Sequence, residues 1–187
     1  MDVSDLHRRA VAGMTARIAA ISPGQWTLAT PCSDWDLRGL VNHVAGEMLW
    51  TPPIFEGKTA ADVGGAFDGD VLGEDPQGVW EASVGPSIAA VSAEGALDRT
   101  VHLSFGDVPG EVYASQMFAD ILVHSWDVAR ASSGDELLDP DLVEACLDWF
   151  SDEEEQTYRA AGLIGPAVTP GDDAPQTVLL ARFGRTA

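Results

Sequence analysis

The stretch that decides the fold is Tyr113-Ala-Ser-Gln-Met-Phe-Ala-Asp-Ile-Leu-Val-His-Ser-Trp-Asp-Val-Ala-Arg130, which contains neither glycine nor proline. Its apolar residues fall on most sides of a helix, as is typical of a helix buried in a protein core. Polar residues interrupt this surface at spacings of four, four and three: Gln116, Asp120, His124 and Asp127. These spacings place all of them on one face. Because a buried carboxylate is costly unless it is paired or bound to a metal, this polar face requires a partner.

Length and composition are those of an ordinary globular protein. The 187 residues, 45% of them hydrophobic, suffice for one domain that buries most of its apolar surface. No apolar run is long enough to cross a membrane, and the N-terminal residues lack the basic and apolar regions of a signal peptide. The sequence therefore predicts a single domain over residues 1–187, a cytoplasmic location, no membrane association, and reduced thiols at Cys32 and Cys146.

The strongly acidic balance bears on partners. A net charge of −20 repels phosphate backbones, and no basic stripe offsets it, which argues against nucleic acid as a partner. A small-molecule substrate is the expected partner. The sequence leaves the oligomeric state open, and a dimer is compatible with it.

Three segments before the central stretch show helical periodicity. They cover residues 5–21, 34–50 and 76–96. Ser4 or Asp5 is expected to cap the first segment. Thr51-Pro52-Pro53 is expected to end the second, because a proline inside a helix removes a hydrogen bond. Residues 53–75 lack periodicity and predict a long loop.

The remaining segments complete the expected fold. Residues 98–112 alternate between apolar and polar side chains and then supply turn residues from Gly106 to Gly110, which predicts a β-hairpin. Asp139-Pro140 opens a fifth helix that is expected to continue to Tyr158. We therefore predict an all-α protein: a four-helix bundle over about residues 5–160 with a small β-hairpin insertion, and a C-terminal extension over 161–187.

Two predicted helices offer metal ligands. Asp120 and His124 lie one turn apart on the central helix, and His43 lies in the middle of the segment 34–50. Two imidazoles and one carboxylate on rigid helices suit Zn²⁺ or a similar divalent ion and leave positions open for water or substrate. An open position is typical of a catalytic rather than a structural site.

Other interpretations compete with this metal site. Acid–base pairs at this spacing are also common surface stabilisers, and a single helical histidine is more often an ordinary hydrogen-bonded residue. In a non-catalytic module, Asp120 would bridge His43 and His124 by hydrogen bonds without a metal. In a purely structural metal site, Glu47 would be the natural fourth ligand.

Two motifs resemble a known family. Trp26-Thr-Leu-Ala-Thr-Pro-Cys-Ser-Asp-Trp-Asp-Leu-Arg-Gly-Leu-Val-Asn-His43 resembles the N-terminal signature of the mycothiol-dependent maleylpyruvate isomerase group of the DinB-like superfamily. Asp120-Ile-Leu-Val-His-Ser-Trp-Asp-Val-Ala-Arg130 resembles its second signature. Gly165-Pro-Ala-Val and the short ending resemble an actinobacterial-type branch, so the resemblance covers nearly the whole chain.

The resemblance implies a DinB-like four-helix bundle whose His43, Asp120 and His124 hold a divalent ion, Zn²⁺ or Ni²⁺. The isomerase pattern has Glu at the position of Asp120, one methylene longer. The resemblance also implies a mycothiol-type thiol as cosubstrate, since a bound cation lowers the pKa of a thiol. The implied activity is a thiol-dependent transferase or isomerase reaction on a small electrophile.

Residues beside the ligands have weaker assignments. Glu47 is an alternative ligand or accepts a hydrogen bond from an imidazole, Asp127 accepts one from His124 or pairs with an arginine, and Gln116 lines the pocket. Cys32 is expected to be buried filler, because no histidine or basic residue lies near it in the sequence. Trp35 is expected in the core or in a pocket wall.

Overall fold

The computed structural model describes residues 1–187 and contains eight α-helices, one short 3₁₀-helix, η1 (Pro23–Gln25), and a two-stranded sheet. Contacts within the chain divide it into two compact units, Met1–Asp135 and Glu136–Ala187. No helix is long and apolar enough to cross a membrane. The single domain predicted for residues 1–187, with a bundle over about 5–160 and an extension over 161–187, stays a prediction.

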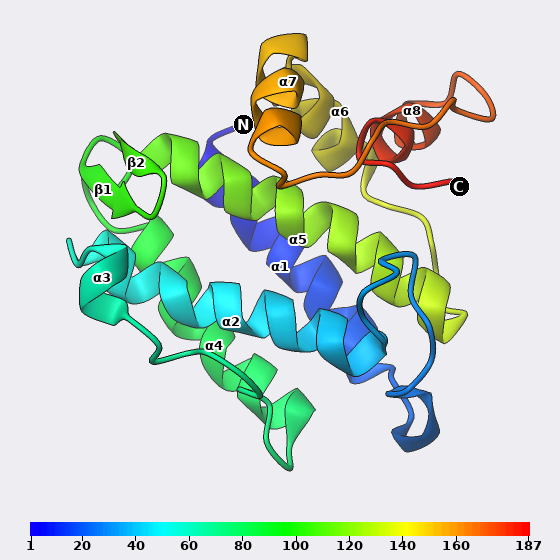
Figure 1. The fold of residues 1–187 in the computed structure, drawn as a ribbon, viewed down its shortest axis with the longest axis horizontal. Helices are drawn as coiled ribbons and strands as arrows, with labels where there is room; N and C mark the ends of the chain where they lie inside the picture. The colour runs from blue at the N-terminus through cyan, green and yellow to red at the C-terminus, as the bar shows by residue number, and fades with distance from the viewer. The chain divides into compact units, whose positions relative to one another are not determined.

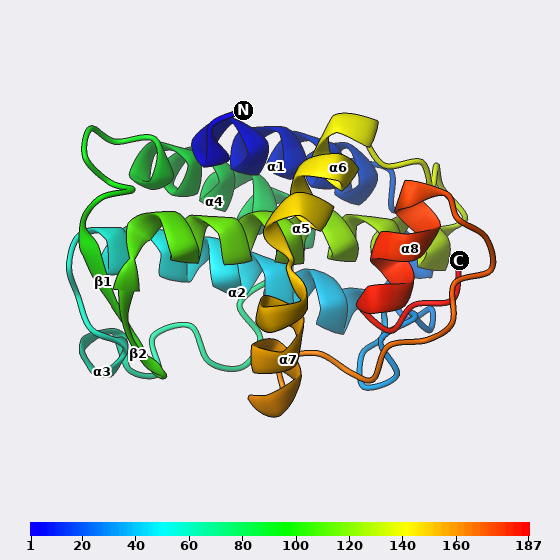
Figure 2. The same ribbon diagram turned by 90° about the horizontal axis from the view of Figure 1, so that it is seen from above.

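Four long helices build the first unit: α1 (Val3–Ala19), α2 (Leu37–Phe55), α4 (Pro76–Val91) and α5 (Gly110–Ser132). Both α1 and α2 pack against α4 and α5, which closes a four-helix bundle. In Figure 1, α1 and α5 run in one direction and α2 and α4 in the other; Figure 2 shows the same helices from above. The predicted all-α class, with a four-helix bundle and a β-hairpin insertion, is confirmed.

The expected end of the second helix is wrong. Pro52 and Pro53 lie inside α2, which continues to Phe55. Both prolines stand in the last turn, where each lacks the N–H that would donate to the carbonyl four residues earlier. Ile54 and Phe55 are buried, so packing of these side chains stabilises the additional turn.

The connection from α2 to α4 is long because the two helices run in the same direction (Figure 1). It contains the short helix α3 (Ala60–Val63). Side chains of α2 hold the rest of this connection in place: Arg38 forms an ion pair with Asp70, and Asn42 bonds the backbone of Gly69 and Val71. The predicted loop is therefore a connection ordered against α2.

The β-hairpin precedes α5. Its strands, β1 (Thr100–Leu103) and β2 (Gly106–Pro109), pair antiparallel with Val101 opposite Val108. The segment expected to form the turn is instead the second strand, and Ser104 and Phe105 form the turn. Gly106 adopts φ 135°, a backbone conformation that favours glycine, directly after it.

Two further expectations about helix ends are corrected. Asp2 rather than Ser4 or Asp5 caps α1, because its side chain accepts from the backbone N–H of Ser4. The fifth helix does not continue to Tyr158: α6 (Pro140–Trp149) ends with Phe150 as its C-cap, and Ser151 caps a separate helix, α7 (Asp152–Ala160). The closing segment forms α8 (Pro175–Arg182).

His7 on α1 is buried without a hydrogen bond at either ring nitrogen. Burial lowers its pKa from 6.5 to about 4. Between these values the unfolded chain binds a proton that the folded protein does not, so the free energy of unfolding falls as the pH falls. We expect a loss of about 3 kcal/mol by pH 4 from this residue, at 1.36 kcal/mol per pKa unit.

His7→Leu removes the titrating group and is expected to flatten this pH dependence. Urea unfolding of both proteins at pH 7 and pH 4.5, without added metal, measures it. The stability advantage of the variant should grow toward low pH. An equal pH dependence in the two proteins would rule out His7 as the cause, and His102→Leu, which alters an exposed ion-paired histidine, is the control.

Candidate metal centre

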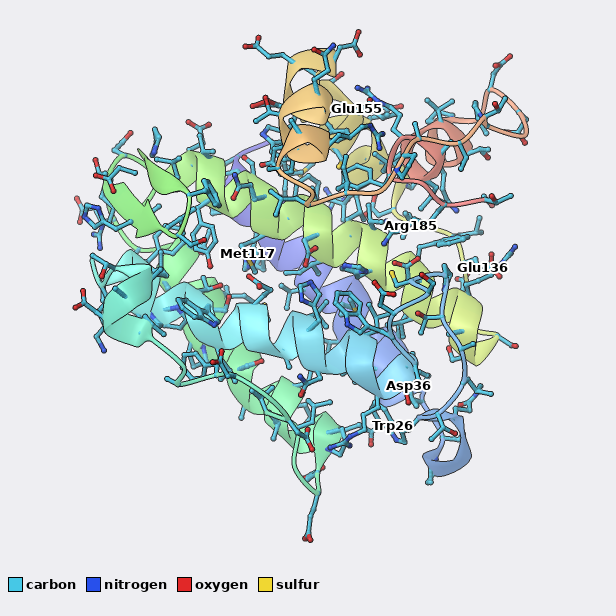
Figure 3. The ribbon with its side chains drawn as sticks, in the orientation of Figure 1. Trp26, Asp36, Met117, Glu136, Glu155 and Arg185 are labelled. Carbon is cyan, nitrogen blue, oxygen red and sulfur yellow. The ribbon has the colours of Figure 1, made fainter.

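The three predicted ligands come together between two facing helices of the bundle. α2 carries His43, and α5 carries Asp120 and His124. The Nε2 atom of His43 lies 3.5 Å from Asp120 Oδ2, and that of His124 lies 3.3 Å from Asp120 Oδ1. Figure 3 shows the side chains in this region, with Asp36 labelled at the N-terminal end of α2 and Met117 between α5 and α2.

These side chains fit a divalent cation. The three ligand atoms lie within 4.8 Å of one another, and the two Nε2 atoms approach different oxygens of the one carboxylate. Imidazole nitrogens and a carboxylate oxygen are usual ligands of Zn²⁺. Asp120 Oδ2 is buried and has no hydrogen-bond partner although an imidazole nitrogen faces it. A buried carboxylate oxygen without a donor is unusual, and a cation between it and the two Nε2 atoms would satisfy it. That these residues bind an ion stays a prediction.

The electrostatics of the centre couple the carboxylate to both histidines. Burial opposes ionisation of Asp120, but the charges of His124 and His43 outweigh it and hold the pKa of Asp120 well below its usual range. Burial likewise opposes protonation of His124, yet Asp120 and the hydrogen bonds around the ring raise the pKa of His124. The site therefore favours a positive charge beside Asp120, supplied by either protons or a cation.

Asp127 lies behind His124, on the side away from Asp120. Its Oδ2 atom is 2.8 Å from His124 Nδ1, and its side chain is fully buried. Because a carboxylate only accepts hydrogen bonds, Nδ1 carries a proton, so Nε2 is the nitrogen that either donates to Asp120 or, once deprotonated, is available to a cation. This arrangement of carboxylate, histidine and ligand-facing nitrogen is typical of metal sites in proteins.

Cys32 is closer to the centre than the sequence indicated. Its Sγ atom lies 3.3 Å from Asp127 Oδ2 and 3.9 Å from His124 Nδ1. Cys32, His124 and Asp127 form a second group of potential metal ligands that shares His124 through its other ring nitrogen. The expectation that Cys32 is buried and has no histidine nearby is wrong: the side chain is half-buried, and a separation of 92 residues in the chain hid its neighbour His124.

Trp35 covers the outer side of the centre. Its ring stacks on His43 with centroids 4.6 Å apart and planes inclined by 21°, and it lies 5.9 Å from the ring of His124. The side chain is partly exposed, so Trp35 forms a wall between the histidines and solvent. The position of Trp35 just before α2 indicated from the sequence that it lies near the residues of this helix. Its stacking on His43 could not be predicted, because it depends on how the preceding loop folds.

Three other polar residues complete the description of the centre and its surroundings. Glu47 follows His43 by one turn of α2. Burial and the negative charge of Asp120 raise the pKa of Glu47, and the charges of His43 and His124 reduce this rise. Neither Glu47 nor Gln116 belongs to the two groups of potential ligands. His102 lies on the hairpin, where Nδ1 contacts Asp107 Oδ1 at 2.7 Å.

Comparisons with known proteins place most of the chain in a family. The family described as "Mycothiol maleylpyruvate isomerase N-terminal domain" matches residues 7–129, which include all three predicted ligands. Two uncharacterized proteins of Mycobacterium tuberculosis, from strains CDC 1551 / Oshkosh and H37Rv, are each 28% identical to this chain over 202 residues, covering 100% of it and 99% of the relative. No solved structure matches the chain. The chain therefore belongs to the mycothiol maleylpyruvate isomerase N-terminal domain family, within the DinB-like proteins.

Proposed function

We propose that this protein binds a divalent metal ion, Zn²⁺ or Ni²⁺, through His43, Asp120 and His124. With a mycothiol-type thiol as cosubstrate, it would catalyse either the transfer of that thiol to a small electrophilic molecule or the isomerisation of that molecule. The observation that carries the proposal is the convergence of the Nε2 atoms of His43 and His124 on the two carboxylate oxygens of Asp120, of which Oδ2 is buried without a hydrogen-bond donor. Membership of the mycothiol-associated family supports the thiol as cosubstrate.

The residues around the proposed ion have separable roles. A bound cation would lower the pKa of a thiol and so supply a thiolate nucleophile. Asp127 holds the imidazole of His124 in the orientation that presents Nε2. Trp35 limits access of water to His43. Glu47 supplies a carboxylate whose raised pKa suits it to accept the proton that the thiol loses.

A non-catalytic binding module is the alternative, and the direct contacts of Asp120 with both histidines favour it. Asp120 and the two imidazoles would then satisfy one another directly. The shorter side chain at the position where the family pattern has Glu is consistent with either function. The two candidates differ in whether metal binding precedes thiol binding.

A thermal-shift screen of divalent ions and thiols tests the proposal. At about 100 times its dissociation constant, a ligand of the folded state stabilises it by about 2.7 kcal/mol. For a protein of this length that corresponds to a rise in Tm of about 5–10 °C. We expect Zn²⁺ or Ni²⁺ to produce this rise and a mycothiol-type thiol to add to it only when the metal is present. A thiol effect that is independent of metal would favour the non-catalytic module.

A further inference from the structure

The loop over residues 29–36, between η1 and α2, reaches both histidines of the proposed centre and is itself tightly held. Ala29 and Asp36 pair across its base. The hydroxyl of Thr30 contacts the carbonyls of Cys32 and Trp35 at 3.0 and 2.8 Å and accepts from the Cys32 backbone N–H. These bonds fix the separation of Cys32 and Trp35, the two loop residues that contact the centre.

One contact of the loop acts on His124 from behind. The Cys32 thiol donates to Asp127 Oδ2, the same oxygen that accepts from His124 Nδ1. The carboxylate therefore has donors from two directions, which restrict its rotation. Because Asp127 determines which nitrogen of His124 is protonated, a restricted carboxylate also restricts the direction of Nε2.

The other contact acts on His43 from the solvent side. His43 is partly exposed, and its ring contacts the stacked indole of Trp35 on one side and the ring of His124 on the other. An offset aromatic stack holds the two ring planes nearly parallel. The imidazole is thereby kept in the plane from which its Nε2 faces Asp120.

We propose that the loop over residues 29–36 positions both imidazoles of the metal centre, through Cys32 and Asp127 on His124 and through Trp35 on His43. Cys32 and Trp35 are positioning residues, and neither is a ligand of the ion. The proposal rests on the proposed function, because it requires His43 and His124 to bind a cation. It assigns the N-terminal motif a role beyond supplying His43.

Pairs of variants at each position test the proposal through Co²⁺ affinity, measured by absorbance titration. Cys32→Ala and Trp35→Ala remove the positioning contacts and are expected to weaken binding about 10-fold or more, the usual cost of losing a partner of a metal ligand. Cys32→Ser keeps a hydroxyl donor and Trp35→Phe keeps a stacking ring, so both should bind within about threefold of the wild type. Cys146→Ala is the matched thiol control and should not change the affinity.

Two outcomes would overturn the positioning role. If Cys32→Ala and Trp35→Ala both bind Co²⁺ as tightly as the wild type, the contacts of Cys32 with Asp127 and of Trp35 with His43 do not position the ligands. A thiolate-to-cobalt charge-transfer band in the wild type that disappears in Cys32→Ser would make Cys32 a ligand. If the wild type binds no Co²⁺, Zn²⁺ or Ni²⁺, the proposed function itself fails.

A measurement without metal keeps the positioning role separately testable. In the ¹³C–¹H NMR spectrum of the metal-free protein, the Cε1 groups of His43 and His124 should each give one sharp signal. Cys32→Ala is expected to broaden or double the signal of His124, and Trp35→Ala that of His43. Unchanged signals in both variants would contradict the proposal whatever the metal titrations show.

Discussion

Replacing both His43 and His124 with alanine is expected to lower the Zn²⁺ affinity by at least about 100-fold, beyond the usual cost of losing a residue that only supports a ligand. The two imidazoles supply two of the three proposed ligands, and Asp120 alone would hold the ion only weakly. Isothermal titration calorimetry measures the affinity, and metal analysis of the purified proteins gives the amount retained.

The controls separate ligand loss from general damage. His102→Ala removes a histidine that pairs with Asp107 on the hairpin and should leave Zn²⁺ binding unchanged. Circular dichroism of the double variant should show the same helical content as the wild type. Equal Zn²⁺ affinity in the double variant and the wild type would remove His43 and His124 from the centre.

Gly110→Ala is expected to destabilise the protein by about 3 kcal/mol, at the upper end of the usual cost of overpacking a core. Gly110 is the first residue of α5, and a Cβ there would lie 2.2 Å from the carbonyl oxygen of Ala96 and 3.1 Å from Phe55 Cε1. Backbone cannot yield as a flexible side chain can, so the start of α5 must shift. For a chain of this length, Tm should fall by about 6–12 °C.

Gly46→Ala is the matched control for this substitution. Gly46 lies inside α2, and a Cβ there meets no atom within 4 Å. Alanine favours the helix over glycine by about 0.5–1 kcal/mol, so this variant should be slightly more stable than the wild type. If Gly110→Ala is as stable as Gly46→Ala in urea unfolding, the close approach of α5 to Ala96 is not a constraint.

Local patterns were sufficient to predict the four helices of the bundle. The central helix could be predicted because periodicity over residues 113–130 is uninterrupted, and α5 exceeds that stretch by only a few residues at either end. The end of α2 could not be predicted, because proline signals a stop while the burial of Ile54 and Phe55, which outweighs it, depends on the other helices. The break before α7 depends on Ser151, whose capping role competes with a continuous helical pattern.

The candidate site divides in the same way. Asp120, His124 and Asp127 share a helix face, so their proximity follows from helical spacing alone. His43 had to be brought to them by the packing of α2 on α5, which the family resemblance implied and periodicity did not. The approach of Cys32 to Asp127 spans 95 residues and depends on the loop fold, so no local pattern could indicate it. His7 likewise looked like an ordinary residue of an amphipathic helix.

A crystal structure of the protein grown with Zn²⁺, with an anomalous difference map collected at the zinc absorption edge, tests the central claim most directly. The account predicts one strong peak between α2 and α5, with His43 Nε2, His124 Nε2 and a carboxylate oxygen of Asp120 at about 2.0–2.2 Å. Asp127 should remain bonded to His124 Nδ1. A map without a peak there, with Asp120 hydrogen-bonded directly to both imidazoles, would contradict it.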